Sequence, residues 1–338
     1  MNLIPILNKA VLASLSESDA REAALALMTG EVPPAQVGGL LSAMRVRGES
    51  GAEILGFARA LRERAAAFPL SSDGLIDTCG TGGDGLSTFN VSTLAGIVAA
   101  AAGARVAKHG NRAVSSRCGS ADVLEALGVR IDGSPSVAAR CVDETGFGFL
   151  FAPHYHQTLR HLAPIRRELG FRSIFNLVGP LANPAKVRLQ VVGVPSVSCL
   201  RPVAEALLAL GVVRALVVHG EDGSDEISLS GPTSVLEVRP EGIEARTIHP
   251  EDAGLPTCRP EDVAGGDAEA NALIATRILN GERGPAHDFV VLNAAAALLV
   301  AECASSLRDG ASMARDALLS LRARAVLDAV RRVSSEAA

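Results

Sequence analysis

Apolar residues recur at steps of three and four through about the first 66 residues, which is the spacing of amphipathic helices. Ser and Glu residues stand at the starts of these stretches, and Gly residues stand at several of the ends. The stretches span residues 3–15, 16–30, 33–48 and 49–68. A polar, turn-forming segment at 69–74 then breaks the pattern. The sequence therefore predicts an all-helical N-terminal domain over residues 1–70.

After this break, short β-branched runs alternate with helical segments. The runs lie at residues 75–79, 104–108, 129–131, 147–153, 189–194 and 215–220, and the helical segments between them at 91–103, 120–128, 134–146 and 198–211. A hairpin-like pattern follows residues 227–238, and helical periodicity returns at 268–280 and 285–330. This alternation predicts a larger α/β domain over residues 71–338, with a mostly parallel central sheet flanked by helices.

Composition narrows the function classes. The chain has 338 residues, which suits about two domains, and its 32 Lys and Arg against 37 Asp and Glu give a net charge of −5. With 48% hydrophobic and 20% charged residues, intrinsic disorder is excluded as the main state. The acidic balance, one Tyr and no Trp argue against binding to nucleic acid.

Cysteine spacing and hydropathy indicate the compartment. The six Cys residues form no CxxC pair and no compact framework, so we expect free thiols in a reducing environment. The N-terminus lacks the features of a secretory leader, and the apolar stretches 91–106 and 289–301 are too short or too polar to cross a bilayer. We therefore expect a soluble, cytoplasmic protein without membrane contact.

The strongest local signal is a glycine-rich loop, DTCGTGGDG at residues 77–85, directly after a predicted strand. Four glycines in six residues allow successive backbone N–H groups to point at one anion. The loop also satisfies GxGxxG, but the next strand ends in Lys108-His109, where a dinucleotide site would need an acidic residue. A tight structural turn stays open as the alternative. Polar residues at the next helix start, 90–93, favour a phosphate or pyrophosphate cradle.

A second polar loop, KHGNRAVSSRCGS at 108–120, follows the next predicted strand and carries three cations and two adjacent hydroxyls. Ligands bind at the carboxyl ends of parallel strands, and consecutive strands are usually neighbours. The two loops are therefore expected to share one anion site, although a solvated basic loop is the alternative for the second.

An acidic turn, HGEDGSDE at 219–226, places four carboxylates within six residues. Such a cluster is either a solvated turn or a Mg²⁺ site, and the phosphate cradle expected at the same sheet edge favours Mg²⁺. His154, His156 and His161 have no fixed zinc spacing, so a structural metal is not expected there. Arg166 and Arg167 are either a pair on a helix surface or a partner for a planar carboxylate.

Taken together, five motifs closely resemble the anthranilate phosphoribosyltransferase family of tryptophan biosynthesis. They are DTCGTGGDG, NVST, KHGNRAVSS, RRELGFRSIFNLVGPLANP and HGEDGSDEISLSGPT, and their order extends over almost the whole chain. The resemblance implies a pentosyltransferase that moves the 5-phosphoribosyl group from 5-phosphoribosyl 1-pyrophosphate (PRPP) to the amino group of anthranilate. It also implies that helices at about 160–185 join the helical domain, and that the protein is a homodimer through that domain.

The resemblance further implies residue roles. The PRPP-binding set would be Gly80, Gly83, Asp84, Thr88, Asn90, Val91, Ser92, Thr93, Lys108, Arg112, Ala113, Ser115, Ser116 and Ser120. The anthranilate-binding set would be Gly80, His109, Asn111 and Arg166, and Mg²⁺ would be held by Ser92, Asp225 and Glu226. Because the arylamine is neutral and nucleophilic at pH 7, no strong general base is required, and His109 is the candidate acceptor of the released proton.

Two other functions compete with this one. A pyrimidine-nucleoside phosphorylase shares the domain plan, but it would need a different basic motif in place of KHGNR. A non-catalytic, nucleic-acid-binding paralogue would need a basic groove, which the net charge of −5 and the Asp225-Glu226 pair disfavour.

Overall fold

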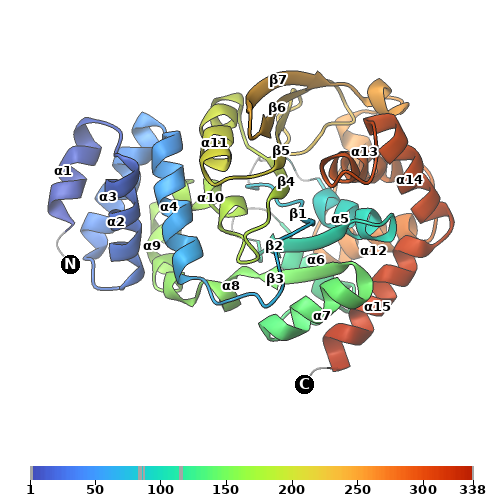
Figure 1. Cartoon of the computed structure of the whole chain (residues 1–338), viewed down its shortest axis with the longest axis horizontal. Coiled ribbons are helices and arrows are strands. Elements are labelled where there is room, and N and C mark those ends of the chain that lie inside the picture. The colour runs from blue at the N-terminus through green and yellow to red at the C-terminus, as the bar shows by residue number, and fades with distance from the viewer. Residues whose placement is uncertain (1–2, 83–85, 87, 114–116, 337–338) are drawn as a thin grey trace.

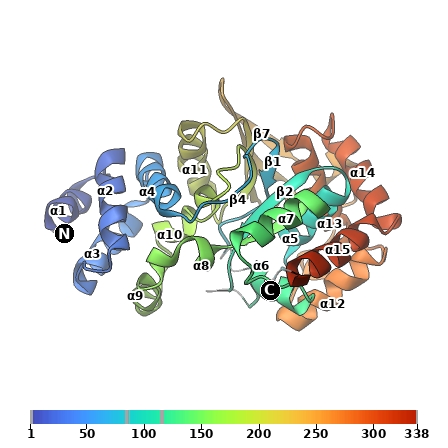
Figure 2. The ribbon, with the colours of Figure 1, turned by 60° about the horizontal axis from the view of Figure 1, so that its bottom comes forward.

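The computed structural model describes residues 3–82, 86, 88–113 and 117–336 of the chain. Four helices form one end of the molecule (Figures 1 and 2). They are α1 (Ile4–Leu12), α2 (Glu17–Met28), α3 (Pro34–Arg47) and α4 (Gly51–Arg64). Ser50 begins α4 with a capping box, since its side chain and that of Glu53 each bond the other's backbone N–H. The predicted all-helical N-terminal segment is thus present.

Two later helices, α9 (Leu162–Leu169) and α10 (Ile174–Leu177), pack against α3 and extend the helical layer. Phe57 of α4 meets Phe175 of α10 edge-to-face, with ring centroids 5.6 Å apart. Both rings are buried, together with Leu27 and Leu40. The chain therefore returns to the helical layer between the third and fourth strands, which brings Arg166 and its neighbours to the edge of the sheet.

The central sheet has seven strands in the order β3-β2-β1-β4-β5-β6-β7. The strands are β1 (Leu75–Asp77), β2 (Arg105–Gly110), β3 (Phe147–Phe151), β4 (Leu189–Gly193), β5 (Arg214–Gly220), β6 (Thr233–Arg239) and β7 (Gly242–Ile248). The first five strands pair in parallel, and the β6–β7 hairpin adds antiparallel strands at one edge. β1 and β2 are neighbours, so the loops that follow them leave the same edge of the sheet.

Helices cover both faces of this sheet (Figure 1). The helices of this part of the chain are α5 (Val91–Ala101), α6 (Ser120–Ala126), α7 (Pro135–Thr145), α8 (Ala152–Tyr155), α11 (Val197–Ala209), α12 (Ala268–Leu279), α13 (Pro285–Val300), α14 (Leu307–Leu319) and α15 (Arg322–Glu336), and α12 and α14 pack on other helices. Along β5, Leu216 and Val218 join the core built with α5 and α13, whereas Ala215 and Val217 join the core with α11 and the helical layer. The predicted mostly parallel sheet flanked by helices is confirmed.

One predicted strand was wrong. Residues 129–131 form no strand, although Val129 and Ile131 are buried in the core beside α5 and α13. The backbone N–H of Arg130 donates to the Ser334 hydroxyl of α15 at 3.2 Å rather than to a sheet partner. The predicted run 147–153 is likewise shorter, because α8 begins at Ala152. Apolar side chains alone do not distinguish a strand from a coil that crosses a core.

All six cysteines are free thiols, as expected from their spacing. Within the described residues, no helix is long and apolar enough to cross a membrane.

Candidate functional site

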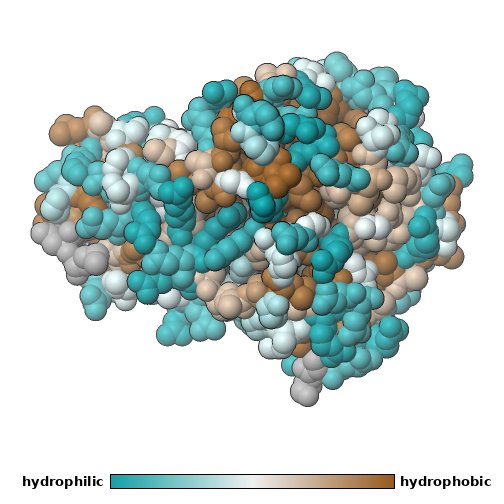
Figure 3. Space-filling view, in the orientation of Figure 1, coloured by the Kyte–Doolittle hydropathy of each residue, from teal (hydrophilic) through white to brown (hydrophobic). Residues whose placement is uncertain are grey.

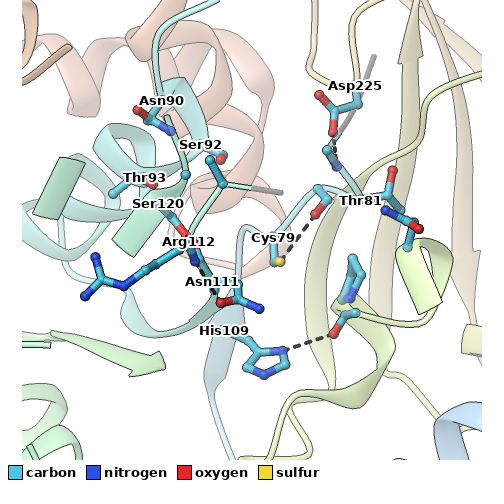
Figure 4. A pocket seen from close by; sticks show the side chains of 18 of the residues that line it. Cys79, Thr81, Asn90, Ser92, Thr93, His109, Asn111, Arg112, Ser120 and Asp225 are labelled. Atoms are coloured by element: carbon cyan, nitrogen blue, oxygen red, sulfur yellow. Dashed lines mark hydrogen bonds between the residues drawn. The ribbon is translucent and has the colours of Figure 1, made fainter. Parts of the chain in front are cut away.

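A cavity of about 300 Å³ opens at the edge where β1 and β2 end (Figure 4). The loop after β1, the loop after β2, the start of α5, the α9–α10 segment and the acidic turn after β5 all contribute to its wall. The predicted residues that line it are Gly80, Thr88, Asn90, Ser92, Thr93, Lys108, His109, Asn111, Arg112, Ala113, Ser120, Arg166, Asp225 and Glu226. Val91 is buried in the core at the first turn of α5 instead. Gly83, Asp84, Ser115 and Ser116 lie outside the described residues.

The glycine-rich loop closes around a carboxylate from the acidic turn. The Gly82 N–H donates to Asp225 Oδ2 at 2.7 Å, with Gly82 in the left-handed region at φ 67°. A Cβ at Gly80 would lie 2.7 Å from that same oxygen, so a side chain there would displace it. The Thr81 N–H donates to the Gly193 carbonyl at 2.8 Å, which ties the loop to β4. Asp225 is thus fixed at the mouth of the loop (Figure 4).

Polar residues at the start of α5 face the same space. Asn90 makes no side-chain cap; its Nδ2 donates to the Cys118 carbonyl at 3.2 Å and its Oδ1 accepts from Asn271 Nδ2 at 3.0 Å. This bridge holds the helix start against the loop after β2. The positive end of α5 and the Ser92 hydroxyl therefore face the cavity from a fixed position.

Lys108 is buried beneath these groups. Its Nζ donates to the Thr78 carbonyl at 2.8 Å and lies 3.4 Å from Ser92 Oγ. Nearby Asp77 accepts hydrogen bonds from Asn183 Nδ2 at 2.8 Å and from the His109 N–H at 3.3 Å. Burial raises the pKa of Asp77 to about 6, although the Lys108 charge acts in the opposite direction. The cation is thus held at the floor of the cavity by backbone carbonyl contact and an adjacent acid.

His109 and Arg166 form the opposite wall. His109 Nδ1 lies 3.0 Å from the Gly179 carbonyl, and burial, with the neighbouring His156 ring, lowers the pKa of His109 to about 3. Arg166 Nη2 donates to Asn176 Oδ1 at 3.4 Å, and its guanidinium lies 5.3 Å from the centroid of the Phe175 ring. Burial lowers the pKa of Arg166. This wall combines a cation with a neutral imidazole.

Arg112, Arg166 and Arg167 take different positions relative to the cavity. Arg166 lines the cavity, whereas Arg167 is exposed on the same helix. Arg112 directs its guanidinium to Glu125 and to Asp122 Oδ1 at 3.2 Å, so its charge is paired beside the cavity rather than at its centre (Figure 4).

The carboxylates of the acidic turn have two different surroundings. Asp222 accepts from the hydroxyls of Ser224 at 2.7 Å and Ser228 at 2.6 Å, which closes the turn. Asp225 and Glu226 instead line the cavity, across which Ser92 lies. Within the described residues, no group of three or more His, Cys, Asp or Glu side chains is placed to hold a metal ion. Two carboxylates and a hydroxyl are hard oxygen donors, and this set fits Mg²⁺, which typically takes one or two carboxylates together with substrate oxygens and water.

The three histidines around Tyr155 contact the backbone. His154, His156 and His161 each bond a different backbone carbonyl, at 3.3, 3.1 and 2.7 Å. Their rings are therefore committed to separate parts of the fold.

Comparison with known proteins follows the same division of the chain. Residues 72–324 match the model of a glycosyl transferase family, a/b domain, and residues 6–65 match the helical bundle domain of that family. The anthranilate phosphoribosyltransferase of Thermomicrobium roseum is 54% identical over 318 residues, which cover 93% of this chain and 91% of that protein. The one from Rubrobacter xylanophilus is 53% identical, covering 95% and 94%. The chain belongs to the anthranilate phosphoribosyltransferase family.

Solved structures of this family superpose on the whole chain. The anthranilate phosphoribosyltransferase of Thermus thermophilus matches with a TM-score of 0.92 at 47% identity, covering 97% of this chain and 99% of that one. The Saccharomyces cerevisiae enzyme in complex with PRPP and Mg matches with a TM-score of 0.90 at 27% identity, covering 99% and 98%. The predicted family resemblance is thus confirmed.

Two buried asparagines that support this anthranilate phosphoribosyltransferase site were not predicted from the sequence. Asn293 of α13 receives the Ile227 N–H at 3.1 Å and donates to the Ile227 carbonyl at 3.0 Å, directly after the acidic pair. Asn271 of α12 donates to Asn90 and accepts the Gly266 N–H at 2.7 Å. For Asn293 a signal existed, because an amide within the apolar run VVLNAAAALL must be hydrogen-bonded when it is buried.

Proposed function

We propose that this protein transfers the 5-phosphoribosyl group from PRPP to the amino group of anthranilate and releases pyrophosphate. The observation that carries the proposal is a shared cavity in which an anion cradle with buried Lys108 faces a wall with Arg166 and neutral His109. The anion cradle suits pyrophosphate, and the wall with Arg166 and His109 suits an aromatic amino acid with a free carboxylate. Membership of the family supports this pairing, and the comparisons do not favour a nucleoside phosphorylase or a nucleic-acid-binding paralogue.

Loss of pyrophosphate from the sugar develops negative charge on the leaving group and positive charge on the ring. Lys108 and the first turn of α5 line the cavity, and the lysine charge and the positive end of the helix would stabilise this leaving group. Gly80, Thr81 and Gly82 of the glycine-rich loop line the same side of the cavity. We assign to this wall those residues of the expected PRPP set that line the cavity, and Arg112 must exchange Glu125 for phosphate in order to join them.

Mg²⁺ would be held by Asp225, Glu226 and Ser92, and it would neutralise charge on the pyrophosphate. The Gly82 N–H donates to the Asp225 carboxylate, so the glycine-rich loop positions one oxygen donor of the set.

On the acceptor side, Arg166 offers a guanidinium for the anthranilate carboxylate, and its stacking on Phe175 restricts its orientation. Asn111 and Gly80 complete this subsite. His109 is neutral, and a protonated arylamine is strongly acidic, so even a base with its pKa lowered to about 3 can accept the released proton.

We further propose a homodimer through the helical domain, taken as residues 1–70 with the helices at about 160–185, while residues 71–338 form the α/β domain. Large apolar side chains are exposed on this layer, among them Val11 at 64%, Leu12 at 86% and Val46 at 89%. Figure 3 shows brown hydrophobic atoms at the α1 end of the molecule. Exposed apolar groups of this kind mark interaction surfaces. Sedimentation should give a dimer that Leu12→Asp dissociates. A cytoplasmic location belongs to the same proposal.

The deciding experiment mixes the purified protein with anthranilate and PRPP and follows anthranilate fluorescence with and without Mg²⁺. Decay that requires protein, PRPP and Mg²⁺ together is the expected result. A folded protein that leaves the fluorescence unchanged but cleaves pyrimidine nucleosides with free phosphate would replace this proposal with a phosphorylase. Retention on heparin at moderate salt would instead support the nucleic-acid-binding paralogue.

A further inference from the structure

Four consecutive backbone carbonyls, those of residues 179–182, each accept a hydrogen bond from a side chain of a different element. We call them the carbonyl strap. The donors are His109 Nδ1 at 3.0 Å, Gln190 Nε2 at 2.9 Å, Arg62 Nε at 2.6 Å and His156 Nε2 at 3.1 Å, in the order of the carbonyls. They come from β2, β4, α4 and the residue after α8.

The local sequence explains why the strap needs side-chain donors. Residues 180–182 form a single 3-10 turn, whose internal bond is Ala182 N–H to the Gly179 carbonyl at 3.2 Å. Pro180, Leu181 and Ala182 are buried, and their carbonyls face no sheet partner. Because a buried carbonyl must find a donor, the fold supplies one to each from outside the segment.

For His109 this contact decides the tautomer. A carbonyl can only accept, so Nδ1 carries the ring proton and Nε2 presents a lone pair. His109 Nε2 is buried and has no hydrogen-bond partner within the described part of the chain, and the residue lines the cavity. The strap therefore orients the imidazole nitrogen of His109 that can accept a proton.

Arg62 links the strap to the helical layer. It lies in the last turn of α4 and donates to the Leu181 carbonyl, two residues beyond the carbonyl that holds His109. Burial lowers the pKa of Arg62 to about 10, so the guanidinium stays charged at neutral pH. Gly179 and Pro180 also line the cavity next to Phe175 and Asn176. A shift of the strap therefore acts directly on the acceptor wall, and none of the four donors belongs to the described part of the glycine-rich loop.

We propose that Arg62 is a positioning residue for the acceptor side of the site, acting through the carbonyl strap that sets the orientation and tautomer of His109. This inference rests on the proposed function for its kinetic consequence. Its structural part, the Nδ1–H tautomer, stands independently of activity.

The test compares Arg62→Met with Arg64→Met, a variant of an exposed arginine on the same helix. Arg62→Met should raise the KM for anthranilate about tenfold or more and change the KM for PRPP less than about twofold, and Arg62→Lys should recover part of the loss. Arg64→Met should match the wild type. Equal changes in both KM values, or none, would overturn the proposal, because a purely structural role lowers the amount of active enzyme without separating the substrates.

A second measurement holds even where Arg62→Met fails to fold. The ¹⁵N NMR spectrum of histidine-labelled wild-type protein should show His109 protonated at Nδ1 and bare at Nε2, with the signal assigned by its loss in His109→Asn. An Nε2–H tautomer would refute the role of the strap. A wild type that shows the Nδ1–H tautomer but transfers nothing would leave the strap intact and refute the proposed function instead.

Discussion

Gly193, the last residue of β4, lies where a methyl group would collide with the acidic turn. A Cβ built there lies 1.5 Å from the Asp225 carbonyl oxygen and 2.5 Å from its carbonyl carbon. Contacts under 3.0 Å are essentially never seen, so Gly193→Ala must separate the two atoms by about 1.5 Å. The backbone at Gly193 is not in the left-handed region, and the effect is therefore a collision between two segments rather than torsional strain.

The collision affects both segments that anchor the glycine-rich loop. Gly193 accepts the Thr81 N–H at 2.8 Å, and Asp225 Oδ2 accepts the Gly82 N–H, so β4 and the acidic turn together anchor the glycine-rich loop. Displacement of a positioned group by about 1 Å costs on the order of 100-fold in rate. Overpacking in a buried position costs about 1 to 3 kcal/mol of stability. We expect Gly193→Ala to lose at least about 100-fold in kcat/KM and to require more Mg²⁺.

Anthranilate fluorescence, recorded over a Mg²⁺ titration at saturating PRPP, measures this directly, and urea denaturation gives the stability loss. Gly231→Ala is the matched control, because a Cβ at Gly231 meets nothing within 4 Å. A folded Gly193→Ala protein with wild-type turnover and an unchanged Mg²⁺ response would show that the position of Asp225 does not matter, and the assignment of the acidic turn would then be wrong.

Three further outcomes are expected. Arg166→Ala should lower kcat/KM for anthranilate by the equivalent of about 1.5 to 3 kcal/mol and affect PRPP far less, and equal losses would remove the residue from the acceptor side. Asp225→Asn combined with Glu226→Gln should shift the Mg²⁺ titration to higher concentrations, whereas an unaltered curve would identify a solvated turn. Burial lowers the pKa of His156 from 6.5 to about 4, so below pH 6.5 the unfolded chain binds a proton at this residue more readily than the folded chain does. The free energy of unfolding therefore falls by up to about 1.4 kcal/mol for each unit by which the pH is lowered between these values. His156→Gln retains a donor for the Ala182 carbonyl and should flatten that fall in pH-dependent urea denaturation.

The sequence predicted the helical layer, the parallel sheet and the meeting of two polar loops because each depends on local spacing or on a general rule of chain connection. Helical periodicity needs only neighbouring residues, and loops after adjacent parallel strands share an edge whatever their composition. The prediction failed at residues 129–131, where burial of Val129 and Ile131 imitates a strand and the hydrogen bond goes to Ser334.

The tertiary structure alone decided which polar groups are engaged. The Gly82–Asp225 bond joins residues 143 positions apart, the bonds between Asn293 and Ile227 span 66, and Arg62 reaches across 119 to Leu181. Residue type and spacing do not distinguish Asp222, which closes a turn, from Asp225, which lines the cavity, and only the family resemblance selected Asp225 from the sequence. A composition of glycines, cations and carboxylates indicates the class of ligand. Which atoms are oriented toward it depends on how distant segments satisfy one another's buried donors and acceptors, and that requirement is met only in the folded chain.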